Sequence, residues 1–295
     1  MPTKPTKQSK FCTQLILIKN CHYRARPDNL KKGRKKMKIA LVGYGKMGHM
    51  LEQAAIRDGH EVVTTIDVVA DDAKVKVAQG DTEAIVRAVK SSGAEGIIEF
   101  SHPSAVLANI KALLPLGLPL IVGTTGWNKE YDNIKKYAQE VGGTLLTAGN
   151  FSIGVNMFYK IVAEAAKIMS EYSEYDVATW EAHHNQKADS PSGTALEIAK
   201  RVMEGYPEKT EMVFDAFHER PAKNQLHVSS TRCGNIPGTH KVFFDGIADT
   251  IELTHTARSR EGFATGAVQT LVKLDNALKT GKLSKGNLYF IEDVI

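Results

Sequence analysis

A glycine-rich turn between a strand and a helix constrains the fold of this chain more than any other stretch. Gly43-Tyr44-Gly45-Lys46-Met47-Gly48 follows the apolar segment 38–43 and opens the helix-periodic segment 47–59, after which the β-branched segment 61–67 ends in Asp67. In a βαβ unit, glycines so spaced permit a tight turn, close approach of the backbone to a pyrophosphate, and close packing of helix on strand. The stretch predicts a dinucleotide-binding turn in which Asp67 accepts hydrogen bonds from the adenosine ribose.

The alternation of strand and helix continues to about residue 150 and predicts an α/β fold with a doubly wound parallel sheet. Further strands are expected at 96–101, 119–125 and 144–150, and helices at 83–91, 103–113 and 129–141. Ligands of such sheets bind at the carboxyl ends of the strands, which here carry Phe100, Gly123, Thr124, Thr125, Ala148, Gly149, Asn150 and Phe151. Ordinary turns use the same residue types, but the position of the last two groups favours a cofactor site.

The pattern changes in the second half of the chain. A helix expected at 154–170 is followed by longer strands at 176–184, 225–232, 240–245 and 250–256, which predict a central α+β domain with a mixed sheet. One face of that sheet is expected to be free for contact between subunits. A final helix at 260–278 carries an apolar stripe suited to cover the first domain. We therefore expect a dinucleotide-binding domain of residues 37–152 and 260–295, and a substrate-binding and oligomerisation domain of residues 153–259.

The first 36 residues do not look like a domain. They hold eleven Lys and Arg residues against the single Asp28, whereas the remaining chain carries 27 basic and 32 acidic groups. We expect an unstructured or mis-assigned leader, with Met37 an alternative start, and no nucleic-acid partner for the mildly acidic body. The longest apolar run, 113–123, is short and broken by proline and glycine, so no membrane span is expected.

The cysteines indicate a reducing compartment. Cys12 and Cys21 lie in the leader, and only Cys233 lies in the body. This usage excludes a disulfide framework within the body and favours a cytoplasmic location.

Candidate reactive groups gather in EAHHNQKADSPSGT, residues 181–194. His183 and His184 titrate near neutral pH and Lys187 is a cation, so the stretch offers a proton donor beside positive charge, which suits an anionic substrate. Taken alone, two adjacent histidines are more often ordinary surface or core residues. No metal is expected, because no acidic residue completes a recognisable ligand spacing and neighbouring histidines point apart.

The same stretch ends in the start of a helix. Thr194 followed three residues later by Glu197 is a capping-box signature ahead of an apolar-periodic run. The first backbone N–H groups of a helix lack partners within it, so the turn formed by Ser192, Gly193 and Thr194 is expected to bind a carboxylate or a phosphate.

Together these motifs resemble the 4-hydroxy-tetrahydrodipicolinate reductase family, also called dihydrodipicolinate reductases, of bacterial diaminopimelate and lysine biosynthesis. The resemblance covers 37–295 and rests most on the run His-His-x-x-Lys-x-Asp-x-Pro-Ser-Gly-Thr-Ala at 183–195, with a second match at 252–268. It implies a Rossmann domain completed by the C-terminal helix, a central substrate and tetramerisation domain, and a homotetramer that acts on a small dicarboxylate. Two departures are small: Ser190 stands where alanine is usual, and Glu99 where aspartate is common.

The resemblance also implies a role for each matching residue. His183 matches the general acid and Lys187 the second proton donor, while His184, Gly193 and Thr194 match substrate contacts. The implied cofactor site comprises Gly43 to Gly48, Asp67, Gly123 to Thr125 and Ala148 to Phe151. The implied reaction is the NAD(P)H-dependent reduction of 4-hydroxy-tetrahydrodipicolinate to tetrahydrodipicolinate. Hydride delivered to the unsaturated ring leaves electron density that a proton must quench, and a dicarboxylate needs a cationic, N–H-lined seat.

The residues after Asp67 bear on the cofactor. We expect NADH to be used at least as well as NADPH, because Asp67 would repel a 2′-phosphate and Val68-Val69-Ala70 supply no arginine to hold one. Lys74 and Lys76 lie close enough in sequence to soften this discrimination.

Two other functions stay open at this point. The first is another two-domain amino-acid-pathway dehydrogenase, such as aspartate or homoserine dehydrogenase, which would not need His183 and Lys187 as a pair. The second is a catalytically silent NAD-binding regulator whose basic leader contacts nucleic acid, and which would show no turnover.

Overall fold

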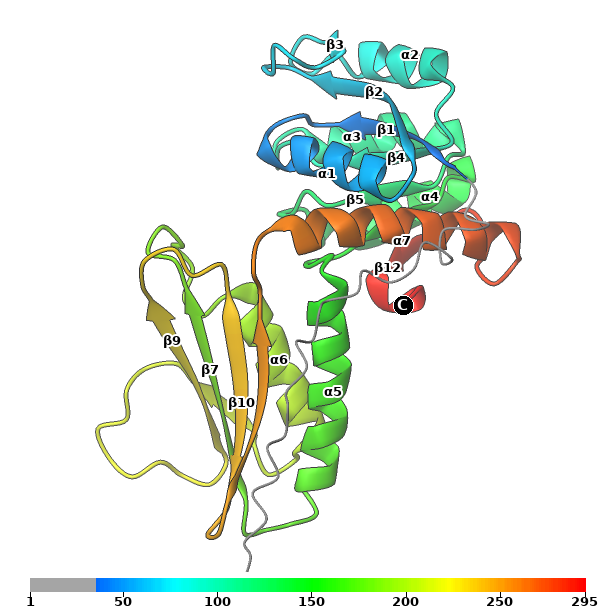
Figure 1. Cartoon of the computed structure of the whole chain (residues 1–295). Coiled ribbons are helices and arrows are strands. Elements are labelled where there is room, and N and C mark those ends of the chain that lie inside the picture. The colour runs from blue at the N-terminus through cyan, green and yellow to red at the C-terminus, as the bar shows by residue number, and fades with distance from the viewer. Residues whose placement is uncertain (1–35) are drawn as a thin grey trace, which may run out of the picture. The chain divides into compact units, whose positions relative to one another are not determined.

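Seven parallel strands form the larger sheet of the computed structural model, which describes residues 36–295. The order is β12-β6-β5-β4-β1-β2-β3, and each neighbouring pair runs parallel, which confirms the predicted doubly wound sheet (Figure 1). The prediction for the leader falls almost wholly on residues 1–35 and lies outside the described residues. The strands are β1 (Lys38–Val42), β2 (Glu61–Asp67), β3 (Val75–Lys76), β4 (Gly96–Glu99), β5 (Leu120–Val122), β6 (Leu145–Thr147) and β12 (Leu288–Phe290).

Helices cover both faces of this sheet, as the strand–helix alternation predicted. One face packs against α1 (Lys46–Arg57) and α7 (Glu261–Lys279), whose buried residues share a core with Leu41, Ile98 and Leu146 of the strands. The opposite face packs against α2 (Thr82–Ser92), α3 (Val106–Leu113) and α4 (Tyr131–Val141). Short 3₁₀ turns lie at η2 (Leu114–Leu116), η3 (Asn128–Glu130) and η4 (Ile291–Asp293). The helix expected from residue 260 therefore does cover the first sheet.

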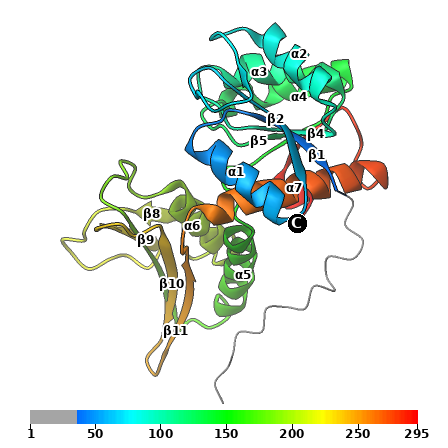
Figure 2. The same ribbon diagram turned by 45° about the horizontal axis from the view of Figure 1, so that its top comes forward.

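The second sheet is mixed, in the order β11-β10-β7-β9-β8. β10 runs antiparallel to β7 and β11, whereas β9 runs parallel to β7 and β8. Two helices, α5 (Ile153–Met169) and α6 (Gly193–Gly205), pack on one face around Phe158, Ile198 and Phe244 (Figure 2). The strands are β7 (Asp176–His183), β8 (Glu211–Val213), β9 (Gln225–Arg232), β10 (Thr239–Asp245) and β11 (Thr250–Thr256).

Strand register in this sheet decides which side chains meet. Alternate residues of β7 turn toward the helices, so Glu181 and His183 share that face. β10 places His240 opposite Glu181, and β9 places Arg232 opposite His183. Three neighbouring strands thus direct polar side chains to one end of the sheet.

Two predicted helix starts differ from the structure. The helix expected from residue 103 begins at Val106, because residues 102–105 form a turn closed by the bond from the Ala105 N–H to the His102 carbonyl at 2.9 Å. The predicted capping box at Thr194 and Glu197 is wrong: α6 begins at Gly193, and Ser192 is its N-cap residue. Within residues 36–295, no helix is both long and apolar enough to cross a lipid bilayer.

Candidate active site

The predicted catalytic stretch and part of the predicted cofactor site line one cavity of about 760 Å³, here called the catalytic pocket. Its walls from the end of β7 and the start of α6 carry His183, His184, Lys187, Ser192, Gly193 and Thr194. Its walls from the turns after β5 and β6 carry Thr125, Ala148, Gly149 and Asn150. Groups predicted separately to bind substrate and cofactor therefore face a shared space.

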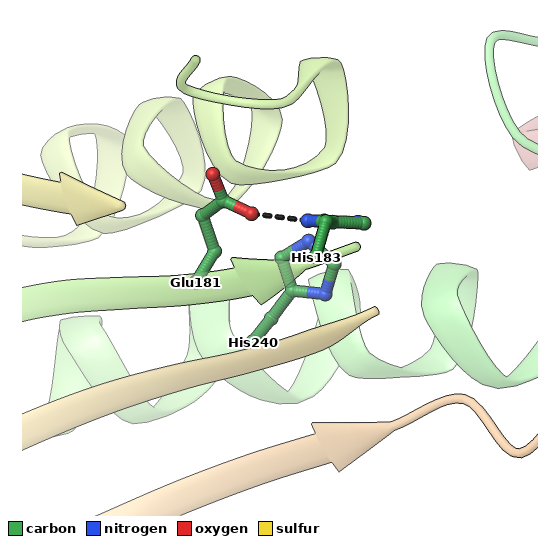
Figure 3. A group of neighbouring side chains, drawn as sticks. All are labelled: Glu181, His183 and His240. Carbon is green, nitrogen blue, oxygen red and sulfur yellow. Dashed lines mark hydrogen bonds and ion pairs between the residues drawn. The ribbon is translucent and has the colours of Figure 1, made fainter. Parts of the chain in front are cut away.

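His183 is held by a buried carboxylate (Figure 3). Its Nδ1 faces Oε2 of Glu181, and Oε1 of Glu181 accepts a hydrogen bond from Nη1 of Arg232 at 2.8 Å. Burial alone would raise the pKa of Glu181, but the hydrogen bonds from His183 and Arg232 outweigh burial and lower it to about 2. Glu181 is therefore a carboxylate at neutral pH.

Lys187 is positioned by an ion pair within its own loop. Its ammonium lies 2.7 Å from Oδ1 of Asp189, and its backbone N–H donates to the carbonyl of His184 at 3.1 Å. Burial opposes ionisation of Asp189, but the contact with Lys187 prevails and lowers the pKa of that carboxyl. The Lys187 side chain is only 23% exposed, and the residue lines the catalytic pocket.

His240 packs edge-on against His183, with ring centroids 5.2 Å apart (Figure 3). Only 4% of His240 is exposed, and this burial lowers its pKa to about 3, so the ring is neutral at pH 7. Glu181, His183 and His240 bring potential ligand atoms within 4.8 Å of one another. The sequence argument that no acidic residue completes a recognisable ligand spacing did not consider Glu181, which lies on the same face of the same strand as His183.

The start of α6 forms the other wall of the catalytic pocket. Oγ of Ser192 accepts from the Ala195 N–H at 3.1 Å and lies 3.3 Å from Nε2 of His240, so this hydroxyl caps the helix. Gly193 has open space where a Cβ would project. Oγ1 of Thr194 accepts from Nδ2 of Asn150 at 3.2 Å, a direct link between a predicted substrate residue and a predicted cofactor residue.

The glycine-rich turn has the backbone geometry that its sequence predicts. Gly43 has φ +94°, and a Cβ there would lie 2.2 Å from the Phe100 carbonyl oxygen, so a larger residue cannot take this position. Gly45, immediately before α1, has nothing within 4 Å of a Cβ and caps the helix without a side chain. This open helix N-terminus fits a pyrophosphate.

A second cavity of about 600 Å³, the nucleotide pocket, lies beside this turn and is lined by Gly43, Gly45, Asp67 and Phe100 among others. Oδ2 of Asp67 accepts from the Tyr44 N–H at 2.6 Å, and Oδ1 accepts from the Val69 and Ala70 N–H groups at 2.7 and 3.0 Å. Partial burial would raise the pKa of Asp67, but these backbone donors outweigh it and lower the pKa.

Other predicted cofactor residues make packing contacts. Tyr44 is buried with its hydroxyl on Glu52, Met47 packs on the core, and Gly48 lies against the Gly43 carbonyl, whereas Lys46 is exposed. Gly123 lies under the Phe100 ring, where a Cβ would be 1.9 Å away, and Phe151 is buried in the core. Oγ1 of Thr124 donates to Oε2 of the buried Glu99 at 2.7 Å. Neither the catalytic nor the nucleotide pocket is lined by the following predicted residues: Tyr44, Lys46, Met47, Gly48, Gly123, Thr124 and Phe151.

Sequence reasoning missed several residues of the site. Glu181 could have been found, because a residue two positions before His183 on a strand shares its face. Arg232 and His240 lie far away in sequence, and only the register of β9 and β10 brings them to β7. Arg260, whose Nη2 lies 3.3 Å from Nε2 of His184, also lines the catalytic pocket.

Comparison with known proteins decides the family. Residues 37–151 match the family model described as dihydrodipicolinate reductase, N-terminus, and residues 154–295 match the model described as dihydrodipicolinate reductase, C-terminus. The chain belongs to the dihydrodipicolinate reductase family. This membership confirms the predicted resemblance and the prediction of an oxidoreductase that performs the NAD(P)H-dependent reduction of 4-hydroxy-tetrahydrodipicolinate in lysine biosynthesis.

Comparison with individual dihydrodipicolinate reductases supports the same family assignment. The 4-hydroxy-tetrahydrodipicolinate reductase of Christiangramia forsetii is 35% identical over 232 residues, which cover 79% of this chain and 90% of the relative. That of Archaeoglobus fulgidus is 33% identical over 267 residues, which cover 88% of this chain and all of the relative. A solved dihydrodipicolinate reductase from Paenisporosarcina sp. TG-14, with dipicolinate bound, has the same fold, with a TM-score of 0.68 at 20% identity over 88% of this chain and all of that one.

Proposed function

We propose that this member of the family carries out its reduction in the catalytic pocket, with His183 as general acid and Lys187 as second proton donor and carboxylate partner. The observation that carries the proposal is the shared wall: proton-bearing side chains and the turns after β5 and β6 line one cavity. A nicotinamide nucleotide, when bound, supplies the hydride. His183 then gives a proton to the electron-rich position that reduction leaves on the substrate ring.

The proposed substrate-binding site combines cationic side chains with the backbone N–H groups at the start of α6. The dicarboxylate is held by His184 and Lys187 on one side, and by Ser192, Gly193 and Thr194 at the start of α6 on the other. Because the Ser192 hydroxyl already caps the helix, that residue contributes through its backbone. Gly193 is exposed with open space where a Cβ would project, and the positive end of the helix dipole favours a bound carboxylate there.

The cofactor site is proposed to comprise the residues that the sequence indicated, in two roles. Gly43 and Gly45 with the first N–H groups of α1 hold the pyrophosphate, and Asp67 holds the adenosine ribose. Thr125, Ala148, Gly149 and Asn150 face the catalytic pocket and hold the nicotinamide end. Most of the remaining members shape the turns by packing: Tyr44, Met47, Gly48, Gly123, Thr124 and Phe151. Phe100 lines the nucleotide pocket, and Lys46 is exposed within the glycine-rich turn.

NADH is the preferred cofactor in this proposal, at least as good as NADPH. Asp67 is ionised and fixed by three backbone N–H groups beside the nucleotide pocket, so it repels a 2′-phosphate. The two nearby lysines are engaged elsewhere: Lys74 donates to the Val62 carbonyl at 2.8 Å, and Lys76 pairs with Asp71.

In this proposal each of the two sheets forms the framework of one functional domain. Residues 37–152 and 260–295 form the nucleotide-binding domain, because they supply every strand of the parallel sheet and the helix α7 that covers it. Residues 153–259 form the substrate-binding and oligomerisation domain, because they supply the mixed sheet and its two helices.

We also propose a homotetramer assembled through the mixed sheet. Its face away from α5 and α6 carries Trp180, Lys241 and Phe243, which are only half-buried within the single chain. A half-buried aromatic surface on an ordered sheet suits a contact with a second copy of the same sheet.

A cytoplasmic location is part of the proposal. Cys233, the cysteine in the described part of the chain, is exposed and free, a state that a reducing compartment maintains. Fractionation of cells followed by detection of the chain would test this, and recovery in a secreted fraction would contradict it.

Substitution of the two proton donors tests the catalytic assignment. His183→Ala should lower kcat by roughly 10²- to 10⁴-fold, the usual effect of losing a general acid, with NADH affinity near wild type. Lys187→Ala should lower kcat at least as much and also raise substrate KM, because a cation beside a carboxylate is lost. Turnover is followed by NADH absorbance with substrate made freshly by dihydrodipicolinate synthase.

The matched control is Asn185→Ala, in the same loop but with an exposed side chain whose Oδ1 accepts a hydrogen bond from Nε2 of Gln186. It should keep near-normal kinetics. Near-normal turnover of His183→Ala, or equal inactivation of Asn185→Ala, would show that this stretch is not the catalytic centre.

A further inference from the structure

Glu181 is a buried carboxylate that neither donates nor accepts a proton in the proposed reaction. Its side chain has no exposed surface, and both of its oxygens are occupied by side chains of the site, one by His183 and the other by Arg232. A buried ion pair is weak evidence for stability, because desolvation of both charges offsets their attraction. The position of this pair beside the general acid points to a role in the reaction.

The contact with Glu181 decides where the hydrogens of His183 lie. An ionised carboxylate accepts hydrogen bonds and donates none, so the ring nitrogen that faces it, Nδ1, must carry a hydrogen. Nε2 is then the atom from which a proton can leave. Gly238 keeps that side of the ring open, since a Cβ at Gly238 would lie 2.9 Å from Nε2.

We propose that Glu181, held by Arg232, is a positioning residue that fixes the tautomer and orientation of His183 and stabilises its imidazolium form. The inference rests on the proposed role of His183 as general acid. During the reaction the 4-hydroxyl of the substrate leaves as water, the hydride forms one new C–H bond of the ring, and the Nε2–H bond of the imidazolium breaks as its proton forms the second. The hydrogen on Nδ1 stays in place, and Glu181 remains ionised throughout.

The other titratable and charged groups beside His183 do not serve as the counter-charge of its imidazolium. His240 on β10 is neutral because of its burial. The ammonium of Lys187 is paired with Asp189, and the guanidinium of Arg232 on β9 is directed at Glu181. His184 on the same loop contacts Arg260. The guanidinium on Glu181 also disfavours a metal ion in the cluster of Glu181, His183 and His240, because it would repel the cation.

Arg232 has a second arm that separates its effect from that of Glu181. Its Nη2 donates to the backbone oxygen of Asp189, whose side chain pairs with Lys187. Loss of the guanidinium fork should therefore disturb both proton donors, whereas loss of the Glu181 charge should disturb His183 alone.

The first experiment reads the tautomer in the unaltered full-length chain. Protein labelled with ¹⁵N-histidine is studied by NMR at alkaline pH, where one of the two ring nitrogens carries no hydrogen, and His183→Gln identifies the signals of His183. We expect the hydrogen on Nδ1, the less common form for free histidine. A hydrogen on Nε2 would overturn the proposal whatever the kinetics of His183→Ala, which test the proposed function separately.

The second experiment compares Glu181→Gln, Glu181→Asp and Arg232→Lys by kinetics across pH. Glu181→Gln should lower kcat about 10²- to 10⁴-fold with substrate KM and NADH affinity near wild type. The pH above which kcat/KM falls should move down by about one unit or more, because the imidazolium loses its counter-charge. Glu181→Asp should recover at least about tenfold of the lost kcat, since the charge returns.

Arg232→Lys keeps a positive charge but loses the fork, so it should lower kcat and also raise substrate KM. Glu211→Gln, the same exchange at an exposed position of β8 in the same sheet, is the matched control and should behave as wild type. The proposal is overturned if Glu181→Gln keeps kcat within about threefold of wild type, or loses activity with no change in the pH profile.

Discussion

At the scale of single residues, His240 shows how a buried titratable group can lie beside a general acid without competing with it. Its burial and the nearby positive groups keep its pKa near 3, far below the 6.5 of a free histidine. Its hydroxyl neighbour, Ser192, lies 3.3 Å from Nε2. The neutral ring fills the space behind His183 and adds no charge that would oppose an imidazolium there.

This burial makes the stability of the protein pH-dependent. Below about pH 6.5 the unfolded chain protonates His240 while the folded chain does not until about pH 3, so stability is lost as pH falls through that window. The loss reaches about 1.4 kcal/mol per pH unit for one such group. His240→Gln should therefore lose less stability than wild type between pH 7 and pH 5, as measured by urea unfolding. An exchange at the exposed His218 serves as control, and equal losses in all three proteins would contradict the prediction.

Asp67 governs the second residue-scale prediction, the choice of cofactor. Wild type should show kcat/KM for NADH at least equal to that for NADPH, because the fixed carboxylate repels a 2′-phosphate. Asp67→Asn removes the charge and keeps the shape, and should shift the ratio toward NADPH by about tenfold. Lys76→Ala, opposite Asp67 in the pairing of β2 with β3 but ion-paired with Asp71, should change the ratio little. A wild-type enzyme that strongly favours NADPH would contradict the proposal.

Residue types alone were enough to find part of the site. His183 and Lys187 stand out because both can donate a proton and both precede a helix start within one short segment. Arg232 did not stand out, because its importance comes from the pairing of β9 with β7, and strand register is a property of the folded sheet. The pairing of strands that lie far apart in the chain could not be predicted from the single sequence.

At the scale of elements, α6 begins two residues earlier than its strongest sequence signal suggests. Ser192 caps the helix, Thr194 bonds Asn150, and Glu197 pairs with Arg201 at 2.8 Å, so the two residues of the predicted capping box serve other partners. Several Ser and Thr residues near a helix start compete for the cap, and tertiary contacts decide among them.

The cap supplies an element-scale prediction. Ser192→Ala should lower the free energy of unfolding by about 1 kcal/mol, because the Ala195 N–H loses its partner. Glu197→Gln should cost less, since a partly exposed ion pair between neighbouring turns of one helix contributes little. Urea unfolding of the two variants and wild type measures the difference. If Glu197→Gln were the more damaging exchange, the helix would be capped as the sequence first indicated.

At the same scale, the two sheets differ in how much of their strand order could be predicted from the sequence. The parallel sheet was readable because short apolar strands alternate with amphipathic helices such as α4, and right-handed crossovers then restrict the topology. Four of the five strands of the mixed sheet were also located, β9 and β11 to the residue, whereas the short strand β8 was not expected. Their order was not, because a mixed sheet permits several pairings that patterning alone does not rank.

At the scale of the whole molecule, the proposed tetramer depends on the open face of the mixed sheet. Trp180→Asp and Phe243→Asp should convert the assembly to smaller species, because each places a charge in an apolar contact. Light scattering after size exclusion measures the mass. Ile56→Asp, an exposed apolar residue on α1, is the control and should leave the mass unchanged. A wild-type chain that runs as a monomer would contradict the proposal.

The position of α7 along the chain has a consequence for biosynthesis. This helix covers the face of the parallel sheet that Leu41, Ile98 and Leu146 present, yet it is translated only after the entire mixed sheet. The first half of the chain therefore leaves the ribosome with an apolar face that its own later residues must cover. Until α7 has been translated, the incomplete nucleotide-binding domain exposes this apolar face and can aggregate with other nascent chains. We therefore expect the need for a chaperone to be greatest during this interval.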